Sequence, residues 1–121
     1  MTAFRLDIPE ASPSLNTMRG RHWSHHYQLR KHWSQLIMVA KCQRKLFGIT
    51  PLPKAEVKIT REGYRALDTD NFVGGLKCII DSLREQSFIV DDTPAHITLV
   101  TAQKVIPKSA YPRTLIEIKL L

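Results

Sequence analysis

Four acidic side chains stand in two short groups in the second half of the chain. Asp68 and Asp70 lie in residues 67–71 (LDTDN), and Asp91 and Asp92 follow about twenty residues later. Because residues two apart in an extended segment point to the same side, Asp68 and Asp70 can share one hard cation through their carboxylate oxygens. Two other interpretations stay open: Asp70 as the N-cap of a following helix, and Asp91-Asp92 as part of a turn.

The two acidic groups are expected at strand ends that flank one helix, where consecutive elements tend to be neighbours. Carboxylates crowded there would raise one another's pKa unless a divalent cation neutralised them. Mg²⁺ or Mn²⁺ held on carboxylates activates water and polarises a phosphoryl oxygen. The pattern therefore predicts metal-dependent hydrolysis of a phosphodiester.

The charge distribution indicates what the substrate is. The chain has 121 residues, 18 Lys and Arg against 11 Asp and Glu, and a formal net charge of +7. No acid occurs between Glu10 and Glu56, an interval that also contains Trp23, Tyr27 and Trp33. This segregation favours a surface that binds nucleic-acid phosphates, although a solvated basic surface without a partner is the alternative.

The basic interval is expected to form one long helix after a first strand at residues 3–8. The helix is predicted to run from about His25 to Phe47, with Ser24 as its cap and Gly48 as its terminator. Its predicted apolar stripe consists of Leu29, Trp33, Leu36, Ile37 and Ala40. Three cations, Arg30, Lys41 and Lys45, are expected within about 60° of one another beside that stripe. The residues predicted to contact DNA are Arg19, Arg21, Arg30, Lys41 and Lys45.

The remaining periodicities complete a single domain over residues 1–121. Residues 54–64 alternate as a strand does, a second helix with one buried face follows Asp70, and residues 88–90 are predicted as a short strand ending in acids. Gly74 and Gly75 weaken that helix unless something approaches its backbone closely. Two strand-like runs close the chain. The predicted class is α+β, a mixed β-sheet with two main helices in the order β-α-β-α-β-β-β.

Neither the cysteines nor the termini suggest a secreted or membrane protein. Cys42 and Cys78 have no metal-site or redox spacing, so we assign them no chemistry. The first residues lack the features of a secretion signal, and no apolar run is long enough to span a membrane. A cytoplasmic location is expected.

Several segments resemble one known family. The residues LDTDN, a following helix with KCIIDSL, and FIVDD are similar to the RusA-like family of Holliday junction resolvases, and IPEASPSLN and KVIPKSAYPRTLIEI resemble its flanking regions. The resemblance implies a homodimeric, Mg²⁺-dependent endodeoxyribonuclease, with Mn²⁺ as a substitute, that nicks branched, four-way DNA junctions symmetrically in recombination and repair. It makes Asp68, Asp70 and Asp92 the catalytic metal ligands, with Asp91 beside them. It also suggests a bacterial, phage or prophage context.

One position departs from the family pattern. A catalytic lysine is expected four residues after the second Asp of D-x-D-N, where this chain has Gly74. Lys77 is the candidate replacement, about 10 Å further along the helix than Asp70 and on nearly the same side. The alternative role for Lys77 is a surface ion pair with Asp81. The departure also leaves open a DNA-binding protein with weak or no catalysis, and dimer geometry leaves open a nuclease that tolerates other DNA structures.

Overall fold

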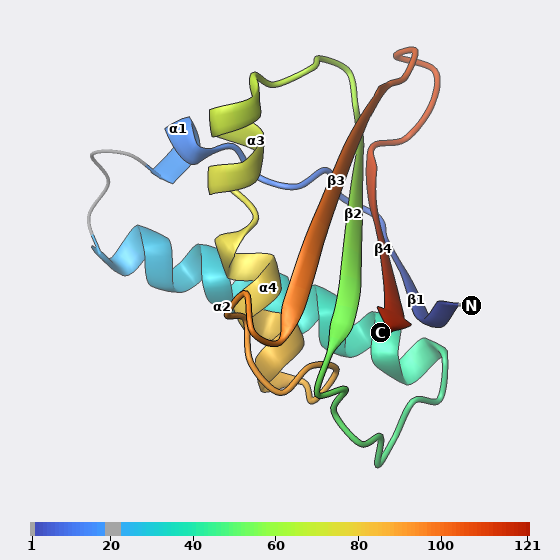
Figure 1. The fold of residues 1–121 in the computed structure, drawn as a ribbon. Helices are drawn as coiled ribbons and strands as arrows, with labels where there is room; N and C mark the ends of the chain where they lie inside the picture. The colour runs from blue at the N-terminus through green and yellow to red at the C-terminus, as the bar shows by residue number, and fades with distance from the viewer. Residues whose placement is uncertain (1, 19–22) are drawn as a thin grey trace.

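A computed structural model of the chain describes residues 2–18 and 23–121. The elements in chain order are β1 (Thr2–Ile8), α1 (Leu15–Met18), α2 (Trp23–Gln43), β2 (Ala55–Gly63), α3 (Thr69–Gly74), α4 (Lys77–Glu85), β3 (Ile97–Val105) and β4 (Arg113–Leu120). The four strands form one sheet in the order β1-β4-β2-β3 (Figure 1). Only the β2–β3 pair is parallel, which makes the sheet mixed and the class α+β, as predicted.

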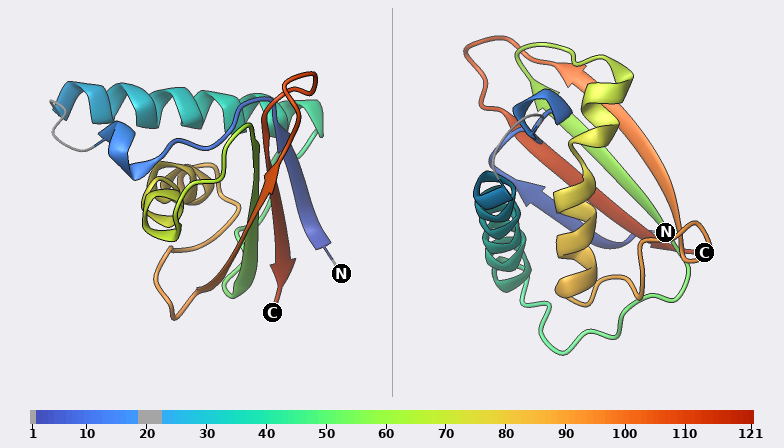
Figure 2. Two further views of the ribbon diagram at one scale, coloured as in Figure 1. Left: turned by 90° about the horizontal axis from the view of Figure 1, so that it is seen from above. Right: turned by 90° about the vertical axis from the view of Figure 1, so that its left-hand side faces the viewer.

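The helices cover one face of the sheet and leave the other open (Figure 2). In β2, Ala55, Val57 and Ile59 are buried beneath the helices, while the intervening Glu56 and Lys58 point to the opposite face. Charged side chains therefore face solvent on one side of a half-buried sheet, which is the usual reason for a period of two.

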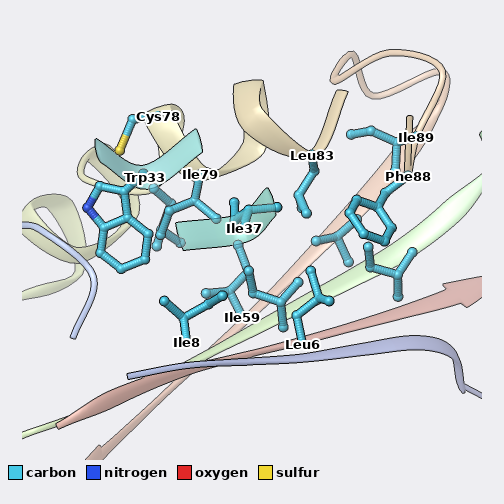
Figure 3. Packing of buried hydrophobic residues seen from close by; sticks show 14 of the residues in the cluster. Leu6, Ile8, Trp33, Ile37, Ile59, Cys78, Ile79, Leu83, Phe88 and Ile89 are labelled. Carbon is cyan, nitrogen blue, oxygen red and sulfur yellow. The ribbon is translucent and has the colours of Figure 1, made fainter. Parts of the chain in front are cut away.

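One hydrophobic cluster joins the two layers. Trp33 and Ile37 of α2 and Ile79 and Leu83 of α4 are at most 1% exposed, and they pack over the buried strand residues (Figure 3). The strand side of this cluster is formed by Leu6, Ile8, Ala55, Val57, Ile59, Ile97, Ile116 and Ile118. The apolar stripe predicted for the long helix is thus confirmed.

The long helix includes its predicted cap and ends earlier than predicted. Its described residues run from Trp23, so Ser24 lies inside it, and it stops at Gln43. Lys45 has a φ of 57°, its N–H donates to the carbonyl of Cys42, and the N–H of Leu46 donates to the carbonyl of Lys41. This is a Schellman ending with a lysine in the left-handed position that glycine usually takes. The predicted terminator, Gly48, lies beyond it.

The helix predicted after Asp70 is two helices, α3 and α4, separated at Gly75. The N–H of Gly75 donates to the carbonyl of Asn71, and a Cβ at Gly75 would lie 1.8 Å from the carbonyl oxygen of Pro13. A Cβ at Gly74 would lie 2.8 Å from the side chain of Leu15. The absence of side chains at Gly74 and Gly75 therefore allows the loop before α1 to pack closely against the helical layer. This is the close approach to the backbone that was named above as a reason for glycine in the helix.

The short strand predicted at residues 88–90 is wrong. Ile89 makes only an isolated bridge with Leu52, through hydrogen bonds from Leu52 N to Phe88 O and from Val90 N to Leu52 O. Phe88 and Ile89 are fully buried. The sequence pattern predicts a strand here because buried loop residues and buried strand residues have the same apolar character.

Candidate functional site

The first acidic pair lies where β2 leads into α3. Asp68, not Asp70, is the N-cap: one carboxylate oxygen accepts a hydrogen bond from the backbone N–H of Asn71 at 2.8 Å, and the other accepts one from the Asn71 side-chain amide at 3.0 Å. Asp70 lies in the first turn of α3, and its residue is exposed. A cap needs few of the acceptor positions of a carboxylate, so both side chains retain oxygens for a cation.

The second acidic pair lies in the loop before β3. The backbone N–H of Asp92 donates to Asp91 Oδ1 at 2.8 Å, and this hydrogen bond is the main reason that the pKa of Asp91 is lowered, with help from its contact to the Asp92 side chain, His96 and Arg84. An Arg84 guanidinium nitrogen lies 3.7 Å from Asp91 Oδ1 and 3.6 Å from Asp92 Oδ1. The expectation that crowding raises the pKa is wrong for Asp91, because backbone donors and a cation of the same chain stabilise its charged form.

Within one chain, the two acidic pairs lie far from each other. β2 and β3 run parallel in register from Ala55↔Ile97 to Gly63↔Val105. Asp68 and Asp70 follow the C-terminal end of β2, whereas Asp91 and Asp92 precede the N-terminal end of β3. At about 3.3 Å per residue, the two ends of this strand pair lie roughly 25 Å apart. In Figure 1, α3 and the loop that follows α4 accordingly lie at opposite ends of the molecule.

The prediction that Asp92 comes alongside Asp68 and Asp70 within one chain is therefore wrong. It assumed that residues 88–90 form a strand carrying the acids toward the first pair. Instead, β2, the two helices and β3 form a crossover unit, in which the chain must travel the full length of the helical layer before the next parallel strand begins.

The three-acid metal site consequently does not fit a single chain. Within residues 2–18 and 23–121, no three His, Cys, Asp or Glu side chains form a group that could hold a metal ion. Each end of the α3–α4 layer supplies two carboxylates, while Mg²⁺ prefers six oxygen ligands in octahedral geometry and completes them with water and substrate oxygens. Each end therefore provides two of the four acidic residues that were predicted to bind the metal.

Lys77 forms the ion pair that was weighed as its alternative role. Its Nζ lies 3.7 Å from Asp81 Oδ2. The Lys77 side chain is 73% exposed and that of Asp81 only 10%. A lysine at position 74 would collide with Leu15. The lysine of the α3–α4 layer lies instead at position 77, on the exposed surface of α4. Because the pair is long and the lysine itself is mostly solvent-exposed, its ammonium group can also contact a phosphate.

The predicted common face of three cations is present only in part: Arg30 and Lys41 both point toward the C-terminal end of α4, and Lys45 is not on the helix. Arg30 pairs with Glu85 of α4. Lys41 donates from Nζ to the carbonyl oxygen of Gln86 at 2.7 Å and lies 5.6 Å from the ring centre of Phe88. Lys45 lies beyond the end of α2. Arg19 and Arg21 are outside the described residues.

Two hollows between α2 and α4 gather residues that are far apart in the sequence. One, of about 260 Å³, is lined by Tyr27, Arg30, Lys31, Ser34 and Glu85. The other, of about 210 Å³, is lined by His26, Arg30, Lys77, Cys78 and Asp81. Arg30 and Lys77, both singled out from the sequence, thus line the same hollow. The periodicity of each helix showed its buried side but not which residues the two helices place together.

One of the two cysteines is shielded from reaction by burial. Cys78 is 4% exposed, and burial raises the pKa of its thiol to about 11. Cys42 is exposed on α2, and the two residues are not disulfide-bonded. A thiol held protonated, as that of Cys78 is, is a poor nucleophile.

Comparison with models of known protein families gives no match, and no curated protein matches the chain. No helix in the described part of the chain combines the length and apolar character needed to cross a membrane.

Proposed function

We propose that this chain is one subunit of a homodimeric, Mg²⁺-dependent endonuclease that nicks four-way DNA junctions in recombination or repair. The resemblance of LDTDN, KCIIDSL and FIVDD to RusA-like resolvases supports the chemistry, and the net charge of +7 supports a polyanionic substrate. The observation that carries the proposal is that the parallel β2–β3 unit places one exposed or half-exposed acidic pair at each end of the same helical layer.

Two copies related by a two-fold axis would bring the unlike pairs together. In such an interface each contact occurs twice, because residue i of one subunit meets residue j of the other and the reverse. If the helical layers of two copies run antiparallel, Asp68 and Asp70 of one face Asp91 and Asp92 of the other, at both ends. Two complete sites result, which suits a reaction that nicks two strands.

β3 provides an edge along which such copies can pair. It is the last strand of the sheet, with β2 as its only partner among the strands of the described residues, and its nine residues run beside the helical layer that separates the acidic pairs. Antiparallel addition of a second β3 satisfies the open backbone groups of this edge. It also gives the two helical layers the antiparallel orientation that the composite site requires.

Carboxylates from both subunits would then hold the metal. A divalent cation bound there would supply a water of lowered pKa and would polarise the phosphoryl oxygen under attack. Arg84, which lies near both Asp91 and Asp92, offsets one of their two negative charges when no cation is bound. Lys77 and Arg30, on the surface between α2 and α4, are placed to hold phosphates of the same DNA.

The test compares a four-way junction with a linear duplex of the same sequence, in Mg²⁺, in Mn²⁺ and in chelator. The proposal expects paired nicks in the junction with either metal and none with chelator. It also expects Asp70→Asn to abolish nicking while junction binding persists, since the substitution removes a metal-binding charge from a basic protein. Normal nicking by Asp70→Asn would remove the acidic residues from the mechanism.

A second candidate is a DNA-binding protein on the same fold that does not turn over. It is favoured by the separation of the acidic pairs within one chain and by Gly74 at the position where the family pattern has lysine. The same assay distinguishes it, because this candidate binds the junction without cutting in either metal. Cuts in both junction and duplex would indicate a nuclease tolerant of DNA structure.

A further inference from the structure

The first two turns of α2 present two large aromatic side chains to solvent. Trp23 is 71% exposed and Tyr27 is 60% exposed, whereas Trp33, the third aromatic residue of the same helix, is 1% exposed and belongs to the core. Residues four apart lie on the same side of a helix, about 6 Å apart along its axis. Trp23 and Tyr27 therefore form one exposed aromatic surface, defined here as the aromatic step of α2.

The charge around the aromatic step is suited to an anion. The 21 residues of α2 include no acid, and Arg30 and Lys31 follow the aromatic residues by one further turn. Tyr27, Arg30 and Lys31 line the hollow of about 260 Å³ against α4. The hollow contains one carboxylate, Glu85, which is paired with Arg30.

We propose that Trp23 and Tyr27 stack against unpaired nucleobases of DNA, with Lys31 and Arg30 contacting the adjoining phosphates. Exposed aromatic rings beside cations are the combination by which proteins bind single-stranded nucleic acid, because every base has a face to stack. The 6 Å step along the helix is close to twice the 3.4 Å rise of stacked bases, a separation that admits one base between two rings. A protein partner could also pack on these aromatic side chains, but binding it would not require a helix without acidic residues. The absence of acids from α2 therefore favours DNA.

This inference rests on the proposed function only in taking DNA as the partner. Bases at the branch point of a four-way junction are more easily unpaired than those inside an arm, so the aromatic step would favour branched over linear DNA. Stacking requires no metal and no cleavage. It can therefore be tested in chelator, apart from the acidic residues.

The experiment uses the emission of the two tryptophans, one exposed and one buried. A short single-stranded oligothymidine is titrated into the whole protein in chelator, and a blunt linear duplex is titrated in parallel. Stacking on Trp23 should quench the exposed, red-shifted component with the single strand and leave the Trp33 component unchanged. In Trp23→Phe the quenching should disappear while binding remains.

Affinities of variants provide the second measurement. Trp23→Ala or Tyr27→Ala should weaken oligothymidine binding by about 5- to 150-fold, the range expected for loss of one stacked base. Binding of the linear duplex should change much less. The matched control is Phe47→Ala, which removes another exposed aromatic side chain, 68% exposed, beyond the opposite end of α2 and should leave both affinities unchanged.

Other results would overturn the inference. Equal quenching by duplex and single strand would show that Trp23 senses DNA without stacking on unpaired bases. An emission that changes with protein concentration in the absence of DNA would show that the aromatic step binds a second copy instead. If the wild-type protein binds the junction but Trp23→Ala and Tyr27→Ala leave oligothymidine affinity unchanged, the aromatic step fails and the nuclease proposal stands. If the wild-type protein binds no DNA at all, both fail.

Discussion

Mixing two inactive variants should recreate one active site if the acidic pairs meet across a dimer. Asp70→Asn disables the β2 end of a chain and Asp92→Asn disables the β3 end. The two ends lie roughly 25 Å apart in one chain, far beyond the reach of carboxylates that share a cation. In a dimer containing one chain of each variant, one composite site carries both substitutions and the other carries neither.

The expected yield follows from this geometry. A random, equal mixture contains about one half mixed dimers, each with one of its two sites intact, so nicking should return to about a quarter of the wild-type rate. Mixed dimers isolated with two affinity tags should reach about one half. The junction should be nicked but rarely resolved, because resolution requires two cuts.

The assay follows single nicks and resolved products of a labelled four-way junction in Mg²⁺. The matched control combines Asp70→Asn with Asp68→Asn, two substitutions at the same end, which disable both composite sites and should restore nothing. If the Asp70→Asn and Asp92→Asn dimer is no more active than its parents, while the wild-type dimer nicks normally, the acidic pairs do not form a shared site.

Three further predictions concern packing, reactivity and phosphate contact. Gly75→Ala should destabilise the protein by at least about 1–3 kcal/mol in urea unfolding, because the added Cβ would lie 1.8 Å from a backbone carbonyl oxygen. The control Gly48→Ala should cost only about 1 kcal/mol, because Gly48 has a φ of 65° but open space around it. In the native protein at pH 8, iodoacetamide should label Cys42 quickly and Cys78 only after unfolding. Because the pKa of Cys78 is higher in the folded than in the unfolded protein, the contribution of Cys78 to the free energy of unfolding should fall as the pH rises from about 9 to about 11. Lys77→Ala should lower the unfolding midpoint only slightly, since the lysine is 73% exposed and its pair with the mostly buried Asp81 is 3.7 Å long, but it should reduce the salt slope of junction binding by about one. An unchanged slope would place Lys77 outside the DNA interface.

Local burial patterns made much of the fold predictable. Ala55, Val57 and Ile59 alternate with charged residues because one face of β2 is buried, and Trp33 and Ile37 repeat at helical spacing because one side of α2 is buried. The end of α2 was not predictable in the same way. Leu46 packs against the core from a turn in which Lys45 adopts a positive φ, a position where the sequence offers no glycine.

The relation between the acidic pairs was the part that sequence could not supply. Asp68, Asp70, Asp91 and Asp92 were identified from their types and spacing, but their separation depends on whether β3 runs parallel or antiparallel to β2. Local patterns do not specify that direction. The same limit applies to Trp23, since its exposure depends on where the helix crosses the edge of the core.

The most direct test of the account is a crystal structure of the protein grown with Mn²⁺ and measured for its anomalous signal. The account predicts a two-fold dimer with a manganese peak at each end of the interface, between Asp68 and Asp70 of one chain and Asp91 and Asp92 of the other. A peak bound by the acids of a single chain, or a dimer in which the unlike acidic pairs face away from each other, would contradict it.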